Sequence, residues 1–178
     1  MTSPRTLGAV LAGGRSSRFG SDKAAATWNG RALVDHAAAL IGQLVDRVVI
    51  VGPDDVADLP GPGLGPLGGI AGALDLAADE GFASVLTIGC DMPRAPAELI
   101  ATLLRRAPAY CPDAPVLGHW PAALGAHLQA WLTRDERSVR GWARAVGALP
   151  ISSPVPLANI NTRADLDALA RDRDLMPL

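Results

Sequence analysis

The stretch TLGAVLAGGRSSRFGSDK, residues 6 to 23, decides the fold of this chain. Thr6 to Leu11 is a short apolar run, as expected of a buried β-strand, and a turn rich in glycine and arginine follows it at once. Two adjacent glycines, Gly13 and Gly14, would let backbone N–H groups approach an anion closely. Phosphate sites of α/β proteins are usually built where a strand ends in such a turn. The stretch therefore predicts a first strand that leads into a phosphate-binding loop.

The only lysine of the chain, Lys23, closes this loop, although lysine and arginine together number sixteen. A lysine ammonium is a compact point charge, whereas the arginine guanidinium is a planar fork, so the exception suggests a position that needs a point charge. Arg15 and Arg18 add positive charge to the same loop. The spacing fits neither a Walker A loop nor the Gly-x-Gly-x-x-Gly dinucleotide fingerprint. We therefore expect a polyphosphate site of another kind.

Apolar runs bounded by turn residues alternate along the chain with segments of helical spacing. Further strands are expected at residues 47 to 51 and 84 to 88, and an extended piece at 114 to 118. Helices are expected at residues 33 to 44, 70 to 79, 96 to 106, 122 to 133 and 139 to 146, with a final helix after a capping box at Thr162 to Asp165. This alternation predicts a doubly wound α/β fold, with a mostly parallel sheet and helices on both faces.

The length of 178 residues fits one domain spanning residues 1 to 178. Residues 52 to 69 hold ten glycines and prolines in eighteen positions, but a helix and a strand follow directly, so we interpret this segment as a shaped loop and not as a linker. The formal net charge of −2 offers no basic footprint for nucleic acid. No apolar run reaches the roughly 20 residues that cross a bilayer. The two cysteines are too few for a disulfide framework, so we expect a cytoplasmic protein without nucleic-acid or membrane partners.

Asp91 lies in Gly89-Cys90-Asp91-Met92-Pro93, directly after the strand expected at residues 84 to 88. Ligands of open α/β sheets gather at the carboxyl ends of strands, where a carboxylate can hold a metal beside a bound nucleotide. An aspartate in such a loop is more often a turn or N-cap residue, and from Asp91 alone that interpretation would be preferred. Together with the positive loop, one carboxylate plus phosphate oxygens suits Mg²⁺, so we interpret Asp91 as the metal ligand.

Two weaker motifs complete the set. Gly65-Pro66-Leu67-Gly68-Gly69 at a helix start would let a flat base or a ribose lie against bare backbone. In Asn159-Ile160-Asn161-Thr162 the two amides occupy alternate positions of an extended segment and so face the same side, although a turn followed by an N-cap would also explain them. The histidines, at positions 36, 119 and 127, have no carboxylate or cysteine at ligand spacing and are expected to be packing or surface residues.

Taken together, LAGGRSSRFGSDK, GPLGG, CDMP and NINT resemble the motifs of the molybdenum cofactor guanylyltransferases, in the same order and over nearly the whole chain. The resemblance implies a Rossmann-like nucleotidyltransferase fold, with a nucleotide-binding half at about residues 1–110 and an acceptor half at about 111–178. It implies transfer of GMP from GTP to the phosphate of molybdopterin or molybdenum-molybdopterin, with Mg²⁺ as cofactor and pyrophosphate as the second product. It also implies transient contact with other cofactor-biosynthesis proteins and with recipient molybdoenzymes.

The resemblance further implies a role for each matching residue. The nucleotide would be contacted by Leu11, Ala12, Gly13, Gly14, Lys23, Asp58 and Asp91. The catalytic residues would be Arg18, which stabilises charge on the transferring phosphoryl group or the departing pyrophosphate, Lys23, which binds phosphate, and Asp91, which holds the metal. Asn159 and Asn161 would bind the acceptor. The chain departs from the family pattern between Val51 and Asp58, where it is shorter and lacks an asparagine that contacts the nucleotide in some members.

Other functions fit parts of this pattern. A molybdopterin cytidylyltransferase or a sugar-phosphate nucleotidyltransferase would share the N-terminal loop, but Gly13-Gly14 and Asn-Ile-Asn-Thr favour the guanine enzymes. A nucleotide-binding cofactor-carrier module would keep the fold without turnover. The presence of Arg18, Lys23 and Asp91 argues against such a loss of catalysis. A plain interaction domain would leave the glycine-rich loop and the single lysine unexplained.

Overall fold

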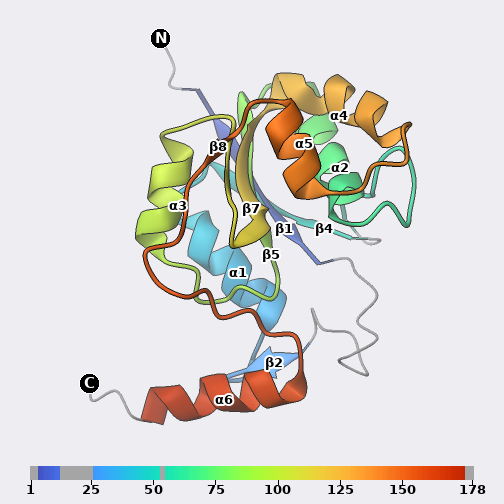
Figure 1. Cartoon of the computed structure of the whole chain (residues 1–178). Coiled ribbons are helices and arrows are strands. Elements are labelled where there is room, and N and C mark those ends of the chain that lie inside the picture. The colour runs from blue at the N-terminus through green and yellow to red at the C-terminus, as the bar shows by residue number, and fades with distance from the viewer. Residues whose placement is uncertain (1–3, 13–25, 53–54, 175–178) are drawn as a thin grey trace.

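A computed structural model describes residues 4–12, 26–52 and 55–174, with side chains up to residue 169 (Figure 1). The described residues form a six-stranded sheet in the order β4-β1-β5-β7-β6-β8. Its strands are β1 (Thr6–Leu11), β4 (Arg47–Val51), β5 (Ser84–Gly89), β6 (Ala109–Cys111), β7 (Ala114–Pro121) and β8 (Leu149–Pro150). Only β7 runs antiparallel to its neighbours among these strands, so the mostly parallel sheet is confirmed.

Helices cover both faces of this sheet, as the sequence predicts. They are α1 (Leu33–Gly42), α2 (Pro66–Asp79), α3 (Ala97–Leu104), α4 (Gly125–Leu132), α5 (Val139–Ala145) and α6 (Arg163–Asp174), with a 3₁₀ turn at Ala122–Leu124. Figure 1 shows α1 and α3 on one side of the sheet and α2, α4 and α5 on the other. In the parts of the chain that the structure describes, no helix combines the length and the apolar character needed to cross a bilayer.

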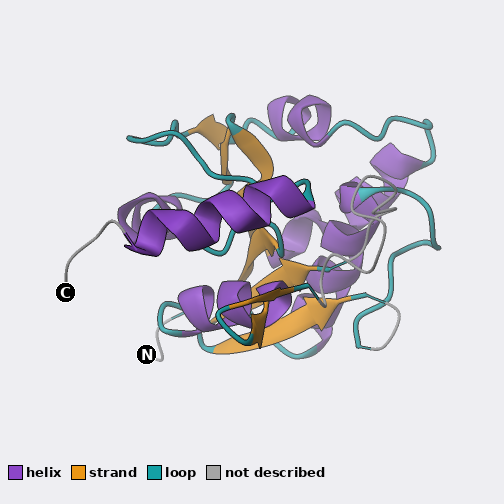
Figure 2. Cartoon of the chain, turned by 90° about the horizontal axis from the view of Figure 1, so that it is seen from below, coloured by secondary structure: helices purple, strands orange, loops and turns teal. Residues whose placement is uncertain are grey.

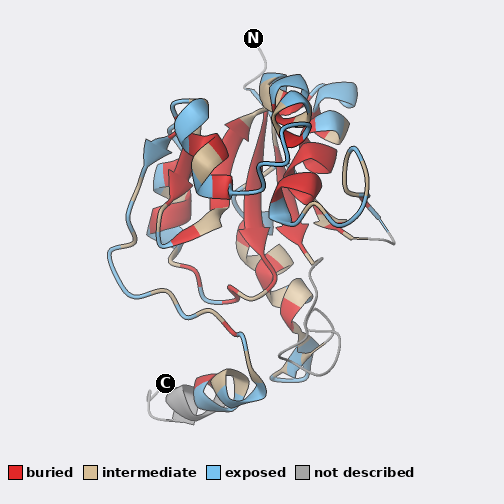
Figure 3. Cartoon of the chain, turned by 45° about the vertical axis from the view of Figure 1, so that its right-hand side comes forward, coloured by how far each residue is buried: buried red, intermediate tan, exposed pale blue. Residues whose placement is uncertain are grey.

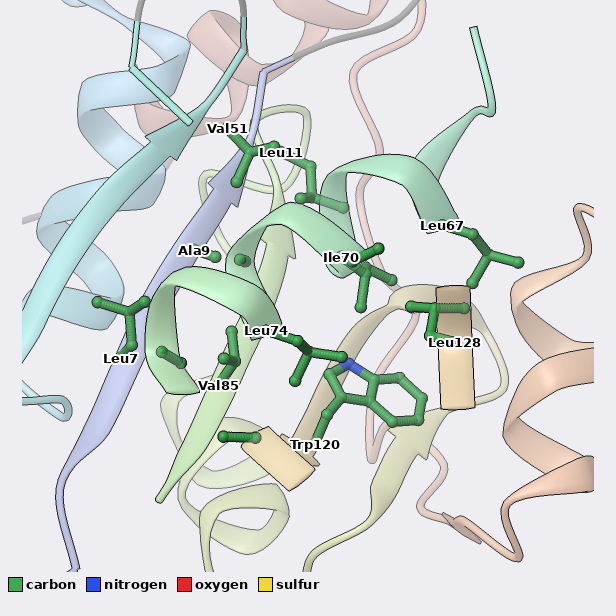
Figure 4. Close-up of a cluster of buried hydrophobic side chains, with 14 of the residues drawn as sticks. Leu7, Ala9, Leu11, Val51, Leu67, Ile70, Leu74, Val85, Trp120 and Leu128 are labelled. Atoms are coloured by element: carbon green, nitrogen blue, oxygen red, sulfur yellow. The ribbon is translucent and has the colours of Figure 1, made fainter. Parts of the chain in front are cut away.

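The strand β1 is covered on both faces, which explains why its sequence is an unbroken apolar run. Leu7, Ala9 and Leu11 belong to the hydrophobic cluster under α2, whereas Val10 belongs to the cluster under α1 and α3. Successive side chains of a strand point to opposite faces, so a strand covered on both sides must be apolar at every position. Figure 4 shows Leu74 of α2 beside the indole of Trp120 in the first of these clusters.

Some elements differ from the sequence prediction. The helix α2 begins at Pro66, four residues earlier than expected, because proline is well suited to the first helical position, where no intrahelical N–H bond is needed. The motif GPLGG therefore forms the first turn of α2. A short hairpin of β2 (Thr27–Trp28) and β3 (Arg31–Ala32) was not predicted, although its Asn-Gly turn has the positive φ angles that favour these two residue types.

The expected capping box at the start of α6 is confirmed. The backbone N–H of Asp165 donates to Thr162 Oγ1 at 3.1 Å, and the N–H of Thr162 donates back to Asp165 Oδ2 at 2.8 Å. Asp165 Oδ2 also accepts from the N–H of Asn161 at 2.8 Å. The aspartate thus replaces the usual glutamate and fixes the chain just before the helix.

His119 is a buried residue of β7 whose ring lies between the sheet and the end of α3. Its Nδ1 is 3.1 Å from Leu103 O and 3.0 Å from Arg106 O, and since both are acceptors, Nδ1 carries the hydrogen. Nε2 therefore accepts from Ser84 Oγ at 2.8 Å. Burial lowers the pKa of His119, although the two carbonyl hydrogen bonds oppose that shift. The ring is thus a neutral packing residue, as the sequence analysis expects.

We expect this histidine to make the fold less stable in mild acid. Because its folded pKa lies below the unfolded value of about 6.5, the unfolded chain binds the proton more readily. The contribution of neutral His119 to the free energy of unfolding is complete above about pH 6.5 and is lost as pH falls toward the folded pKa. Urea unfolding of the wild type and of His119→Gln, from about pH 8 to about pH 5, measures this effect. Other titrating groups act equally in both proteins, so a stability difference that stays constant across this range would contradict the assignment.

Candidate active site

The carboxyl ends of β1 and β5 lie side by side at one edge of the sheet. Leu11 pairs with Gly89 in the parallel register, and the N–H of Cys90 donates to Leu11 O at 3.2 Å. On the other side of β1, the N–H of Ala12 donates to Val51 O at 3.0 Å. The loop that begins at Ala12 and the loop that carries Asp91 therefore leave the sheet next to each other, as the sequence predicts for a ligand site.

The loop that carries Asp91 is anchored by its apolar residues. Cys90 and Met92 are 6% and 2% exposed and pack in the cluster under α1 and α3, while the N–H of Met92 donates to Gly89 O at 3.1 Å. Asp91 itself is partly buried, and its carboxylate lies so close over Gly89 that a Cβ there would overlap Oδ1. A bare glycine at the strand end thus makes room for the carboxylate.

Asp91 is a carboxylate at this sheet edge that could hold a metal whose coordination is completed by substrate oxygens. Among the described residues, no group of three or more His, Cys, Asp or Glu side chains could enclose an ion. Asp91 would then supply a carboxylate to the metal, and phosphate oxygens and water would supply the rest. This is the usual way in which proteins hold Mg²⁺ beside a nucleotide, in contrast to the closed cages of structural zinc.

The segment with the two asparagines reaches the same edge from the far end of the sequence. The N–H of Ile160 donates to the backbone oxygen of Asp91 at 3.0 Å, which places Asn159 and Asn161 on either side of that contact. No strand is formed there. Asn159 Oδ1 is buried and has no hydrogen-bond partner in the described structure, whereas Asn161 is exposed. An unpartnered buried acceptor is costly, which is a reason to expect a donor from a bound molecule.

Asp58 lies against the first turns of α2. The N–H of Leu59 donates to Gly68 O at 3.0 Å, and a Cβ on Gly68 would lie 3.2 Å from Asp58 Oδ2. A Cβ on Gly69 would lie 3.5 Å from Asp58 Oδ1 and 3.3 Å from Leu11 Cδ2. Two of the expected nucleotide contacts, Leu11 and Asp58, therefore meet at the glycine pair of the motif GPLGG.

The carboxylate of Asp58 is only partly exposed, and burial raises its pKa above the ordinary aspartate value. No hydrogen bond or ion pair to this side chain is found among the residues that the structure describes. A neighbouring donor would offset the cost of keeping the charge there. Asp58 is thus a suitable acceptor for N–H or O–H groups of a ligand.

The remaining expected site residues, Gly13, Gly14, Arg18 and Lys23, lie outside the described residues. The chain resumes at Ala26, whose backbone oxygen accepts from the N–H of Leu33 at 2.9 Å at the start of α1. The two ends of the glycine-rich loop are therefore both placed, by Ala12 at the end of β1 and by Ala26 beside α1.

Comparison with known proteins places this arrangement in a family. Residues 8–176 match the MobA-like NTP transferase domain. The chain belongs to this family. A relative from Cereibacter sphaeroides, named molybdenum cofactor guanylyltransferase, is 34% identical, and the match covers 97% of each chain. A relative of the same name from Rhizobium leguminosarum bv. trifolii is 36% identical over 89% of this chain and 88% of that one.

Solved structures show how widely the MobA-like NTP transferase fold is used. Molybdopterin-guanine dinucleotide biosynthesis protein A from Archaeoglobus fulgidus has a TM-score of 0.70 at 19% identity, covering 96% of this chain and 100% of that one. The 2-C-methyl-D-erythritol 4-phosphate cytidylyltransferase from Thermus thermophilus has a TM-score of 0.63 at 17% identity, with coverage of 96% and 100%. At these identities the likeness concerns the fold alone. Since proteins named for guanine and for cytidylyl transfer share it, the fold alone does not select the base.

The family membership makes the chain a nucleotidyltransferase, and this reaction class generally uses a divalent metal. What the sequence reasoning missed in this MobA-like site is the part played by Ile160, whose backbone joins the asparagine segment to the Asp91 loop. The isoleucine between the two asparagines was a signal, because isoleucine is among the residues most often buried.

Proposed function

We propose that the chain transfers GMP from GTP to the phosphate of molybdopterin or molybdenum-molybdopterin, with release of pyrophosphate. The observation that carries this proposal is the meeting of three motifs at one sheet edge, through the bonds from Cys90 N to Leu11 O and from Ile160 N to Asp91 O. Relatives named molybdenum cofactor guanylyltransferase over nearly the full chain support the choice of guanine. A cytoplasmic location and transient contacts with other cofactor-biosynthesis proteins and recipient molybdoenzymes stay predictions.

In this proposal the nucleoside lies beside Leu11 and Asp58, which pack against the glycine pair at the start of α2. The backbone of Leu11 and Ala12 contacts the nucleotide on one side, and Asp58 accepts from N–H or O–H donors on the other. The raised pKa of Asp58 supports this role, because a partly buried carboxylate with no hydrogen-bond partner among the described residues gains from a donor that the ligand brings.

The phosphates of GTP would extend into the glycine-rich loop. Gly13 and Gly14 would offer backbone N–H groups, and Arg18 and Lys23 would neutralise the charge that develops on the transferring phosphoryl group and the pyrophosphate. Asp91 would hold Mg²⁺, which when bound polarises phosphoryl oxygens and offsets their charge. The glycine that lies under the Asp91 carboxylate keeps that side chain at the sheet edge.

The reaction is an in-line displacement at the α-phosphorus of GTP. An oxygen of the pterin phosphate forms the new bond to this phosphorus, and the bond to the β-phosphate oxygen breaks, which frees pyrophosphate. The acceptor phosphate is already ionised near neutral pH, so the chain needs neither a nucleophilic side chain nor a general base. Its residues position two anions, with Asn159 and Asn161 orienting the acceptor.

The test is pyrophosphate release with molybdopterin, Mg²⁺ and either GTP or CTP. We expect kcat/KM for GTP to exceed that for CTP by about 10²-fold or more, because a site that hydrogen-bonds one base leaves buried polar groups unpaired with the other. GTP without molybdopterin is the control and should give no burst of pyrophosphate. A preference for CTP would replace the proposal by the cytidylyltransferase alternative, and turnover with neither nucleotide would reject both.

A further inference from the structure

A small hydrophobic cluster lies outside the two clusters that cover the sheet. Leu33, Ile160 and Leu169 are 0%, 2% and 6% exposed, and Ala26, Trp28 and Leu166 pack against them. We call these six residues the mini-core. They come from the hairpin region, the start of α1, the asparagine segment and the final helix. The mini-core therefore joins segments that lie more than a hundred residues apart in the sequence.

Among the described residues, the buried packing of the helix α6 is with this mini-core. Figure 3 shows α6 apart from the other helices, at the end of the molecule that also carries the short hairpin, and Figure 2 shows it lying across that end. Leu166 and Leu169 are its contributions to the mini-core, and its other described side chains are exposed or only partly buried. The helix has no enzymatic side chain of its own in the proposed function, so its packing calls for another explanation.

Ile160 connects the mini-core to the proposed site. Its side chain belongs to the mini-core, while its backbone N–H donates to the backbone oxygen of Asp91 at 3.0 Å. The residues on either side are the two asparagines, and the capping box fixes the next peptide through the bond from Asn161 N to Asp165 Oδ2 at 2.8 Å. The backbone between the asparagines is thus held at three points, two of which depend on α6.

The mini-core also reaches the exit of the glycine-rich loop. Ala26 is the first described residue after Lys23, and its backbone oxygen accepts from the N–H of Leu33 at 2.9 Å. Ala26 and Leu33 both belong to the mini-core. A displacement of α6 would therefore also shift the asparagine segment, the Asp91 loop and the backbone at Ala26, where the chain leaves the glycine-rich loop.

We propose that the mini-core is a positioning device and that Ile160 is its positioning residue. Packed in one cluster with Leu33 and Leu169, Ile160 holds the acceptor-binding asparagines in a fixed place relative to Asp91, and α6 contributes Leu166 and Leu169 to that cluster. This inference rests on the proposed function, because it gives a purpose to the geometry between acceptor and metal ligand. Misplacement of reacting groups by about 1 Å can reduce turnover by about 10²-fold, which is the scale of the expected effect.

The first test compares Leu169→Ala with Leu132→Ala. Both leucines are 6% exposed and both lie in helices, but Leu132 belongs to α4, which carries no residue of the proposed site. For Leu169→Ala we expect kcat for GMP transfer to fall about 10- to 100-fold, with the KM for Mg-GTP changed by less than about 3-fold. For Leu132→Ala, the protein that remains folded should turn over at the wild-type rate. Equal kcat values for the two variants would overturn the inference.

The second test needs no substrate. Hydrogen exchange of the Ile160 amide, measured on the full chain, should be slow in the wild type and in Leu132→Ala, and at least about 10-fold faster in Leu169→Ala, with exchange in β1 and β5 unchanged. Ile160→Val, which keeps the branched side chain, should restore most of the kcat that Ile160→Ala loses. Unchanged exchange at Ile160 in Leu169→Ala would overturn the coupling. An inactive wild type would reject the proposed function instead. The exchange experiment does not depend on turnover, so it tests the coupling separately.

Discussion

Replacing Asp91 by asparagine is expected to lower kcat/KM for GMP transfer by about 10³-fold, with little loss of stability. The amide keeps the shape of the carboxylate over Gly89 but not its charge, so a divalent metal is held weakly. The fold should persist because Cys90 and Met92, which anchor the loop, stay in place. Pyrophosphate release with molybdopterin and GTP, measured over a range of Mg²⁺ concentrations, gives the rate, and thermal unfolding gives the stability.

A matched control for this experiment is Asp113→Asn. Asp113 lies in the turn between β6 and β7 at the same edge of the sheet, where its Oδ2 accepts from the N–H of Ser153 at 3.1 Å. It has no role in the proposed reaction, so turnover should change by less than about 2-fold. If Asp91→Asn kept near-normal turnover at low Mg²⁺, or lost no more activity than Asp113→Asn, Asp91 would not be the metal ligand.

The parts of the fold that follow from local pattern were predictable from the sequence. The apolar run of β1, with its abrupt change to glycine and arginine, specifies a strand buried on both faces and a loop at its end. The position of Asp91 next to that loop followed from a general rule about parallel sheets, and the bond from Cys90 N to Leu11 O agrees with it. Thr162 and Asp165 likewise identified a helix start because a capping box is a local interaction.

The parts that depend on contacts between distant segments were not predictable in this way. The burial of Ile160 depends on packing with Leu33, which lies more than a hundred residues away, and with Leu169 of α6. The start of α2 was placed too late because glycines disfavour a helix by their intrinsic propensity, whereas here Gly68, Gly69 and Gly72 are needed for close packing. Tertiary contact overrides propensity at such positions, and only the packed structure reveals the contact.

A substitution at Gly72 of α2 is expected to cause the second large effect, a loss of stability. A Cβ at this position would overlap the backbone oxygen of Ala57 and lie 3.2 Å from its carbonyl carbon, and neither atom can rotate away as a side chain could. The segment is also tied to the helix by the bond from Leu59 N to Gly68 O at 3.0 Å. Gly72→Ala should therefore destabilise the protein by about 1–3 kcal/mol, which lowers the melting temperature by roughly 2–12 °C.

The same substitution should also weaken nucleotide binding, because the segment that must move carries Asp58. We expect Mg-GTP to raise the melting temperature of Gly72→Ala by less than it raises that of the wild type. Gly42→Ala is the matched control, since Gly42 ends α1 and a Cβ there meets only Val48 Cγ2, at an ordinary 3.6 Å. Alanine is the better helix former, so this variant should be neutral or more stable by up to about 1 kcal/mol. If Gly72→Ala were as stable as Gly42→Ala and bound Mg-GTP equally well, the close approach of Ala57 to α2 would not be what positions Asp58.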